Sequence, residues 1–577
     1  MYNKYFNEKM FNRQKIVENF ALLLVTILVG IIVSLVAQIF IIGAKYIFNF
    51  LFFNPDFSLT IELFNYKLNL IPLIICVPAS ILVGIILLFS KIPRWYGPAD
   101  TIFAAHTKAG TLDLKSGFTS TFASFISISG GASVGIYGPL VHFGATVSAF
   151  LRRLKFMPKI QHDIIIGSGV AAAISAGFGA PIAGIIFAHE TVLRHFSLKA
   201  ITSIALASMT ANYTAIKLDI VSTPLLLENI PFDLVEVLNG LILIGPFAAI
   251  VAIIFMKLML VINRFPSFAG IKNWQSPIIA GFACGIVGLF LDDVLGLGTN
   301  TLLNVITSNL DVKFLIFLLV GKLILTSLCI GLGFFGGVFS PALFLGALVG
   351  ALIFNIPILN FEPIHLSVLA VSGMAALSSS VIGAPITAII LILELTGSYE
   401  YAIAATLPIA FCTFITSRIF GNSFFDKQLF SRGTEISKGR EQISLNQIKI
   451  SAYMDTKFTS FNLNFDVGTA IKKFTKDSTT EGYIIDRDNN FYGKIKLIDI
   501  IHKRKNQKIK DFVLTKPLIL NPHLSLFDTI KKLSRFVGES IPIVDVKTNK
   551  MFGIISENDV LKAYLEISDE INHIEKD

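Results

Sequence analysis

The chain has 577 residues, 53% of them hydrophobic, and a mean hydropathy of +0.70. A composition this apolar excludes an ordinary soluble protein and indicates a polytopic membrane protein. The formal net charge of +9 does not indicate a nucleic-acid partner, because lysine and arginine are expected in excess in the cytoplasmic segments of membrane proteins. The four cysteines show no metal-ligand spacing and no disulfide framework, so no metal site is expected.

The N-terminal part predicts a charged segment followed by spanning helices. Residues 1–19 are mixed and carry four basic residues, which favour a cytoplasmic N-terminus. Phe20–Ala44 and Leu68–Ser90 are uncharged and long enough to span, since about 20 residues are needed. The basic residues in question are Lys4, Lys9, Arg13 and Lys15.

The most informative stretch is Ser129–Ala145, which lies in an uncharged run but is dense in glycine. Four glycines and Pro139 within ten residues do not suit a plain spanning helix. We expect a broken helix, with a glycine-rich loop and a new helix that begins near Pro139. The N-terminus of such a helix suits an anion. The alternative is a packing site of small residues between helices.

The remaining apolar runs are interrupted, short or long for plain spans, which is typical of transport folds with discontinuous helices. We therefore predict an all-α polytopic membrane domain over residues 20–433. The runs are Ile164–Ala188, Val237–Met256, Ser276–Leu291, Leu323–Phe361, His365–Leu393 and Tyr401–Ser417.

Three patterns recur at a nearly constant offset within this domain. The pattern G-x-x-x-P-x-x-x-x-G-A begins at Gly135 and again 202 residues later at Gly337. The patterns S-G-x-A-A and G-A-P-I each recur at an offset of 204, and each copy of the second leads to a glutamate, Glu190 or Glu394. The two halves are therefore predicted to be structural repeats with a substrate site at their interface. Inversion of the repeats is favoured, because a shared midplane site needs helix ends from both sides.

Residues 434–577 are polar and charged, and they predict a soluble α/β region that is cytoplasmic if the number of crossings is even. This region has its own repeat of strand, turn, strand and helix. The first copy runs from Gly482 through Asp499 and the second from Ile541 through Asp559, at an offset of 59 to 60.

The membrane motifs resemble those of the CLC family of chloride channels and chloride/proton exchangers. The resemblance rests on residues 131–139, on 336–341 and on 423–429, and it covers about residues 15 to 433. It implies an antiparallel internal repeat, a homodimer and one anion pathway per subunit. It also implies that the amides of Val338 and Phe339, between Gly337 and Pro341, coordinate a central anion. Amides of the first motif would form an outer site; its residues are Gly135, Ile136, Tyr137, Gly138 and Pro139.

The first motif departs from the family at its most important position. Where the family usually has a basic residue and then a gating glutamate, this chain has Ile136 and Tyr137. A carboxylate can occupy the anion site and leave it when protonated, whereas a phenol ordinarily titrates near pH 10 and stays neutral. Tyr137 is therefore expected to gate by donating a hydrogen bond to the anion or by blocking the pathway.

Other positions of the resemblance also differ. The proton-relay glutamate of exchangers aligns with Thr191, beside Glu190, and these two residues are the candidates for a proton path. The pore tyrosine aligns with Phe425, which has no hydroxyl. The family's anion-binding serine has its counterpart near Tyr96. For Glu190 and Glu394, helix capping is the favoured alternative to a transport role.

The C-terminal repeat resembles a tandem pair of CBS domains, over about residues 446–505 and 506–566. In that family a Ser/Thr-x-x-Asp stretch can hold a nucleotide ribose. Ser556 and Asp559 fit this pattern, whereas the first copy fits only in Asp499. An adenine nucleotide is the ligand this implies; the alternative is a dimerisation module without a ligand.

The sequence thus predicts passive transport of chloride or similar small anions by a homodimer in the lipid membrane, with no required cofactor and no enzyme activity. One alternative is a chloride/proton antiporter with a non-standard proton route. The other is a CBS-regulated cation transporter, which would need carboxylates at the membrane site.

Overall fold

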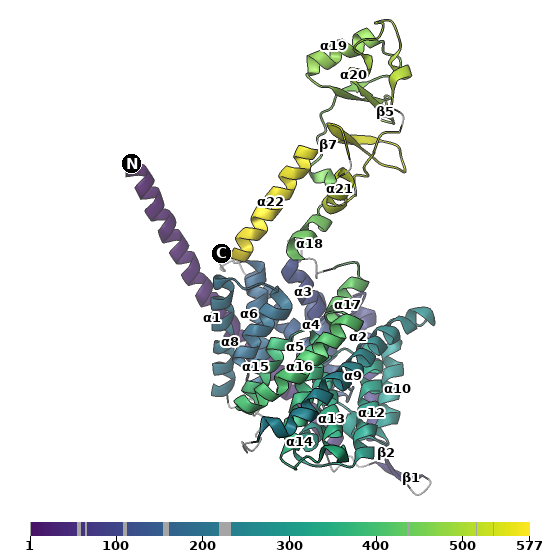
Figure 1. The fold of residues 1–577 in the computed structure, drawn as a ribbon. Coiled ribbons are helices and arrows are strands. Elements are labelled where there is room, and N and C mark those ends of the chain that lie inside the picture. The colour runs from purple at the N-terminus through teal and green to yellow at the C-terminus, as the bar shows by residue number, and fades with distance from the viewer. Residues whose placement is uncertain are drawn as a thin grey trace. The chain divides into compact units, whose positions relative to one another are not determined.

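The computed structural model describes residues 2–54, 59–63, 66–107, 112–153, 161–218, 232–435, 439–514, 516–534 and 536–576. The chain divides into two compact units, Met1–Thr434 and Glu435–Asp577 (Figure 1). The side chains of residues 2–19, including the four N-terminal basic residues, lie outside the described part.

The first unit is mostly helical, and its elements fall into two successive series. The first series is α1 (Tyr2–Phe53), β1 (Thr60–Leu63), β2 (Tyr66–Asn69), α2 (Ile71–Ser90), α3 (Pro98–His106), α4 (Leu114–Ser129), α5 (Tyr137–Arg152), α6 (His162–Phe178), α7 (Pro181–Phe187), the π-helix η2 (Ala188–Leu193) and α8 (Leu198–Lys217). The second series is α9 (Leu234–Phe268), α10 (Ser276–Gly288), η3 (Asp292–Val294), α11 (Thr299–Thr307), α12 (Val312–Gly331), α13 (Phe339–Phe354), η4 (Pro357–Leu359), α14 (His365–Ile382), α15 (Pro385–Thr396), α16 (Tyr399–Ile419) and α17 (Phe424–Ser431).

Six stretches of the described chain are helical, long and apolar enough to cross a membrane. Other apolar helices, such as α13 and α15, have only 10–17 residues, so the membrane unit combines full spans with partial ones. The six are Phe20–Phe53, Ile71–Ser90, Leu234–Phe268, Val312–Gly331, His365–Ile382 and Tyr399–Ser431.

The predicted discontinuities have a local cause that both halves share. Helix α6 ends at Gly179 with φ of 67°, and α14 ends at Gly383 with φ of 78°, in the left-handed region that glycine adopts readily. Two residues later Pro181 and Pro385 begin α7 and α15, where a missing N–H costs nothing. The repeated G-A-P-I pattern therefore breaks the chain into two helices in each half.

The repeated glycines also set the closest helix packing. A β-carbon at Gly144 of α5 would overlap the carbonyl oxygen of Gly169 in α6. In the second half, a β-carbon at Gly346 of α13 would overlap the carbonyl oxygen of Gly373 in α14. Small residues let helix backbones touch in membranes, so part of the glycine pattern does serve packing.

One expectation for the first unit needs correction. The unit is not strictly all-α, because β1 and β2 pair as an antiparallel hairpin from Thr60↔Asn69 to Leu63↔Tyr66. The alternating residues of this stretch form a ladder more readily than a helix. The expected first span is confirmed as Phe20–Phe53, within a helix α1 that runs from Tyr2 to Phe53.

The second unit contains two similar α/β modules. Their elements are α18 (Gly439–Gln447), η6 (Ile450–Ala452), β3 (Ser460–Phe461), α19 (Val467–Asp477), β4 (Glu481–Ile485), β5 (Phe491–Lys496), α20 (Leu497–Ile500), η7 (Ile509–Phe512), α21 (Leu526–Leu533), β6 (Ser540–Val544), β7 (Met551–Ser556) and α22 (Glu557–Lys576). Strands β4 and β5 pair antiparallel, as do β6 and β7, and both pairs carry a register shift near their turn.

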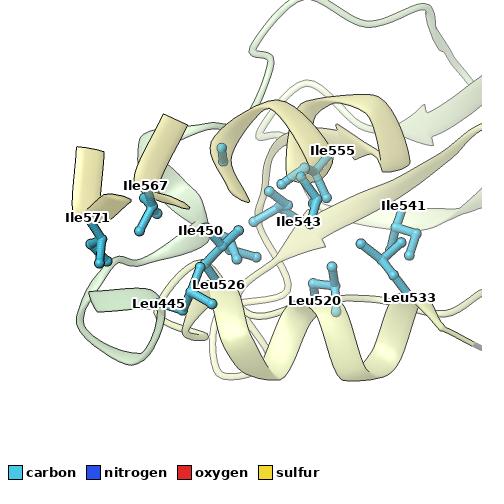
Figure 2. Packing of buried hydrophobic residues seen from close by; sticks show 12 residues of the cluster. Leu445, Ile450, Leu520, Leu526, Leu533, Ile541, Ile543, Ile555, Ile567 and Ile571 are labelled. Atoms are coloured by element: carbon cyan, nitrogen blue, oxygen red, sulfur yellow. The ribbon is translucent and has the colours of Figure 1, made fainter. Parts of the chain in front are cut away.

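The core of the second module is aliphatic. Leu526 and Leu533 of α21 pack with Ile541 and Ile543 of β6, and α22 contributes Ile567 and Ile571 (Figure 2). The two modules also contact each other through their turns, where Phe491 N–H donates to the Asn549 carbonyl and Met551 N–H to that of Asn489. The sequence repeat is therefore a structural repeat in this unit.

Candidate functional site: a cavity at helix N-termini

A cavity of about 460 Å³ lies within the first unit, and the N-terminal residues of several helices line it. Four of them are α3, α5, α13 and α17, which begin at Pro98, Tyr137, Phe339 and Phe424; first-turn residues of α7, α10 and α15 line the cavity too. Free N–H groups and the helix dipole make each N-terminus partly positive. Four such ends at one cavity favour an anion over a cation.

The four N-termini are not equivalent. Helix α17 is capped by Ser423, whose Oγ accepts a hydrogen bond from the Asp426 N–H, and α3 has the Asp100 carboxylate on the Gly97 N–H. Among the described residues, no side chain caps α5 or α13. Among these four helices, the first-turn amides of α5 and α13 are thus the ones left for an anion.

The two uncapped helices are joined directly at their glycines. The Gly135 N–H donates to the Gly337 carbonyl at 2.7 Å, and the Gly337 N–H donates back to Gly135 at 2.6 Å. A β-carbon at Gly337 would overlap the Gly138 amide nitrogen, and one at Gly138 would crowd the Gly337 α-carbon. The two motifs predicted from the repeat therefore meet backbone to backbone, which requires glycine.

Tyr137 lies on the cavity wall with its ring in an aromatic cluster. It stacks on Phe178, with ring centroids 3.4 Å apart, and meets Phe339 edge-on at 5.9 Å. Its hydroxyl donates to the Gly177 carbonyl at 3.4 Å. A β-carbon at Gly177 would lie 3.0 Å from the tyrosine ring, so this glycine makes room for the stack.

Of the other predicted pore residues, the cavity gathers some and leaves others outside. Gly138, Gly337, Val338 and Phe425 line it, whereas Gly135, Ile136, Pro139 and Pro341 do not. Tyr96 does not line it either: the Arg94 guanidinium lies over its ring at 4.5 Å, and its backbone N–H donates to Ser120 Oγ.

Glu190 and Glu394, the matching glutamates of the two halves, cap each other's repeat. Glu190 accepts from the N–H groups of Ile386 and Thr387 at the start of α15, at 3.0 and 2.8 Å, and from the Thr387 hydroxyl. Glu394 accepts from the N–H groups of Ile182 and Ala183 at the start of α7, at 2.9 and 2.7 Å. The structure thus places Glu190 in a cap, as the alternative reading of the sequence expected.

Thr191, the other residue of the predicted proton path, is buried, and its hydroxyl has no hydrogen-bond partner among the described residues. It lies in the π-helix η2 beside Glu190. Neither residue lines the cavity, although Thr387, which Glu190 holds, does. A threonine hydroxyl does not titrate near neutral pH, so this pair has only one carboxylate, and that one caps a helix.

An ion-pair cluster on the wall was not predicted from the sequence. Asp100 accepts hydrogen bonds from Arg94 at 2.9 and 2.5 Å and from Arg432 at 3.1 Å. All three side chains line the cavity. Two cations and one anion leave a positive balance there, which attracts anions through a low-dielectric cleft. The only hint in the sequence was that these charges border apolar runs.

The predicted nucleotide residues lie in the second unit, at the starts of the final helices of the modules. Ser556 and Asp559 bond to each other: Asp559 Oδ2 accepts from the Ser556 N–H at 2.9 Å and from its hydroxyl at 2.6 Å. This is the arrangement of a capping box for α22. Asp499 is exposed at the start of α20.

The fold and the cavity together define a multi-span helical membrane protein with a site suited to an anion. Comparison with known proteins agrees. The family model "Voltage gated chloride channel" matches residues 79–417, more than half of the chain, so the chain belongs to this family of anion transporters, which are not enzymes. A CBS domain model matches residues 509–566.

Similar proteins support the same family. The chain is 28% identical over 338 residues to the H(+)/Cl(-) exchange transporter ClcA of Vibrio parahaemolyticus, which covers 56% of this chain and 70% of that protein. The fold of this chain is similar to that of a slow cyanobacterial Cl-/H+ antiporter, with a TM-score of 0.59 and 21% identity over 72% of this chain and 98% of the other. It is also similar to a eukaryotic CLC transporter (TM-score 0.58, 16% identity, 94% and 98%).

Proposed function

We propose that the protein conducts chloride and similar small anions passively through this cavity. The observation that carries the proposal is the meeting of the uncapped N-termini of α5 and α13 at the cavity, with Tyr137 where the family usually has a glutamate. The amides of Val338 and Phe339 form the central site, and those of Tyr137 and Gly138 form the outer one.

Tyr137 acts as the gate in this proposal, through its ring rather than its charge. The stack on Phe178 and the edge contact with Phe339 hold the ring between the two uncapped helix ends. The hydroxyl is turned to the Gly177 carbonyl. Anion passage requires the ring to leave the stack, and because a phenol is neutral at pH 7 this step carries no proton.

The alternatives fit the site less well. A chloride/proton exchanger, the activity in the names of similar proteins, needs a proton carrier, but Glu190 is committed to the α15 N-terminus and its neighbour is Thr191. A cation transporter needs carboxylates at the cavity, where Asp100 is bound by both Arg94 and Arg432.

We further propose that the two halves of the membrane unit are inverted repeats. The Gly135–Gly337 bridge is antiparallel and joins equivalent residues, as a two-fold axis between the halves would. The reciprocal caps of Glu190 and Glu394 support the same relation. Inversion brings helix N-termini to the midplane from both sides, which a shared anion site requires.

The remaining proposals concern assembly. The protein is a homodimer with a membrane domain over residues 20–433 and a cytoplasmic region over 434–577, whose CBS modules are 446–505 and 506–566. The module repeat and the position of Asp559 at the start of α22 support an adenine nucleotide as the ligand of the pair. Titration of the purified protein with ATP, read as a rise in thermal stability, tests the last point.

The experiment for the main proposal is anion efflux from chloride-loaded liposomes that contain the protein, with external pH recorded. We expect chloride efflux that a potassium ionophore accelerates and that moves no protons against their gradient. Proton uptake driven by chloride would contradict passive conduction. Tyr137→Glu is expected to make the flux rise as pH falls, because protonation releases the new carboxylate from the site. Tyr137→Phe is the matched control and should stay independent of pH.

A further inference from the structure

Resting on the proposed anion conduction, we propose that this pathway selects weakly hydrated anions, with thiocyanate and nitrate ahead of chloride and fluoride last. The proposal follows from the hydroxyl and indole donors of the cavity wall, which are already committed within the protein, and from its aromatic lining.

The hydroxyl groups of the wall are the first observation. Five hydroxyl side chains line the cavity, and each donates its single hydrogen to an acceptor of the protein. The donations are Tyr137 to the Gly177 carbonyl, Ser267 to Arg264, Ser276 to Asn273, Ser431 to Gln428, and Thr387 to the Glu190 carboxylate. A hydroxyl has only one hydrogen to give, so an anion must break one of these bonds to be held by it.

Other polar side chains of the wall are committed fully or in part. The Trp95 indole N–H donates to the Gly333 carbonyl at 2.7 Å. The side-chain amides of Asn263 and Asn273 each donate one of their two N–H hydrogens, to the carbonyls of Gly331 and Pro93 at 3.4 Å, and keep the other. Phe425 lines the wall with no hydroxyl at all.

Besides the arginine and amide side chains of the wall, the donors left to an anion are the backbone amides at the starts of α5 and α13, and these are few. Tyr137 and Gly138 supply two N–H groups before Pro139, which has none. Val338, Phe339 and Ser340 supply three before Pro341. An anion in water has a complete shell of donors, so this site returns only part of what dehydration removes.

Aromatic rings form much of the remaining wall. The edges of aromatic rings carry partial positive charge, so they attract an anion, although more weakly than an N–H group does. The rings also make van der Waals contact with a polarizable anion. The rings are Trp95, Tyr137, Phe178, Phe187, Phe334, Phe335, Phe339, Phe424 and Phe425. Such a wall favours large, polarizable anions.

The cations of the wall do not reverse this order. Arg94 and Arg432 raise the local concentration of every anion, but both are held by Asp100 and remain part-exposed, with side chains 38% and 29% accessible. Selection is therefore set by the cost of dehydration, which is smallest for large monovalent anions.

The test is a flux series with the full-length protein in liposomes, with fluoride, chloride, bromide, nitrate and thiocyanate as the probes under an ionophore clamp. We expect thiocyanate and nitrate to move at least about tenfold faster than fluoride, equivalent to about 1.4 kcal/mol, with chloride between them. A series in which chloride or fluoride leads would overturn the selectivity proposal and leave anion conduction standing. Flux of no anion would instead overturn the proposed function and this inference with it.

A variant tests the donor argument separately. Phe425→Tyr adds one hydroxyl to the wall and is expected to lower the ratio of nitrate to chloride flux. Phe414→Tyr makes the same change on α16 at a side chain that is 62% exposed and outside the cavity, and should leave the ratio unchanged. An unchanged ratio in Phe425→Tyr, or an equal shift in both variants, would overturn the hydroxyl argument.

Discussion

Replacing Glu190 by glutamine separates a proton-carrying role from a capping role. The carboxylate accepts two backbone hydrogen bonds at the start of α15 and one from the Thr387 hydroxyl. Hydrogen bonds to a charged group contribute about 1.5–3 kcal/mol each, and an anion at a helix N-terminus about 0.3–1 kcal/mol more. Glutamine keeps one neutral acceptor. Because the site is half-buried and partly screened, we expect a net loss of about 1–2 kcal/mol.

The matched control is Glu394→Gln, which removes the equivalent carboxylate from the start of α7. If both glutamates are caps, the two variants lose thermal stability by similar amounts, measured by fluorescence-detected size-exclusion chromatography after heating. Both should then keep the anion flux and the proton balance of the unmodified protein in liposomes. Loss of proton movement in Glu190→Gln alone, at unchanged stability, would refute the capping argument.

Three further outcomes are expected. Gly337→Ala places a β-carbon on the Gly138 amide, so it should abolish anion flux and lower the yield of folded protein, measured by chromatography. The control is Gly397→Ala, whose β-carbon would meet nothing within 4 Å. Because Gly397 has φ of 66°, this variant should lose about 1 kcal/mol of folding stability and no more. Asp100→Asn leaves the charges of Arg94 and Arg432 uncompensated at the cavity, so anion flux should rise at low ionic strength. The gain in flux should vanish near 1 M salt, where charges are screened within about 3 Å. A gain that does not depend on salt would contradict this electrostatic explanation. Hydrogen bonds from Asn490 hold the pKa of the Asp486 carboxyl below its usual value. The ionised carboxyl therefore stabilises the fold at neutral pH, and this stabilisation is lost as pH falls below about 4. Calorimetry of the C-terminal transition should show a weaker acid dependence in Asp486→Asn than in the unmodified protein.

The sequence predicted the repeat and its glycine motifs well, because both depend on local chemistry. A pattern that recurs at a constant offset marks equivalent positions, and G-A-P-I marks a helix break wherever it occurs. The offset between the copies could not predict which residues each motif contacts in the folded protein. That Gly135 bonds to Gly337, and that Glu190 caps the other half rather than its own, are consequences of how the halves are placed in space.

The orientation of side chains was the other feature that the sequence could not predict. The alignment of Tyr137 with the gating position came from the motif, but its stack on Phe178 depends on a helix end 41 residues away and on the space left by Gly177. Tyr96 was predicted to lie at the anion site, but Arg94 covers its ring, and its neighbours Gly97 and Pro98 line the cavity instead. Arg94 and Asp100 are six residues apart, but Arg432 lies 332 residues after Asp100, so the sequence did not indicate that the three would meet.

Helix N-termini inside a membrane unit raise the question of which groups satisfy their free N–H donors. An unsatisfied donor in hydrocarbon costs several kcal/mol, so an end without a cap needs another partner. Helices α7 and α15 meet this requirement with a glutamate from the opposite half. Helices α5 and α13 do not, and both border the cavity. Their donors are satisfied when water or an anion lies in that cavity, which supports the proposed anion site at these two helix ends.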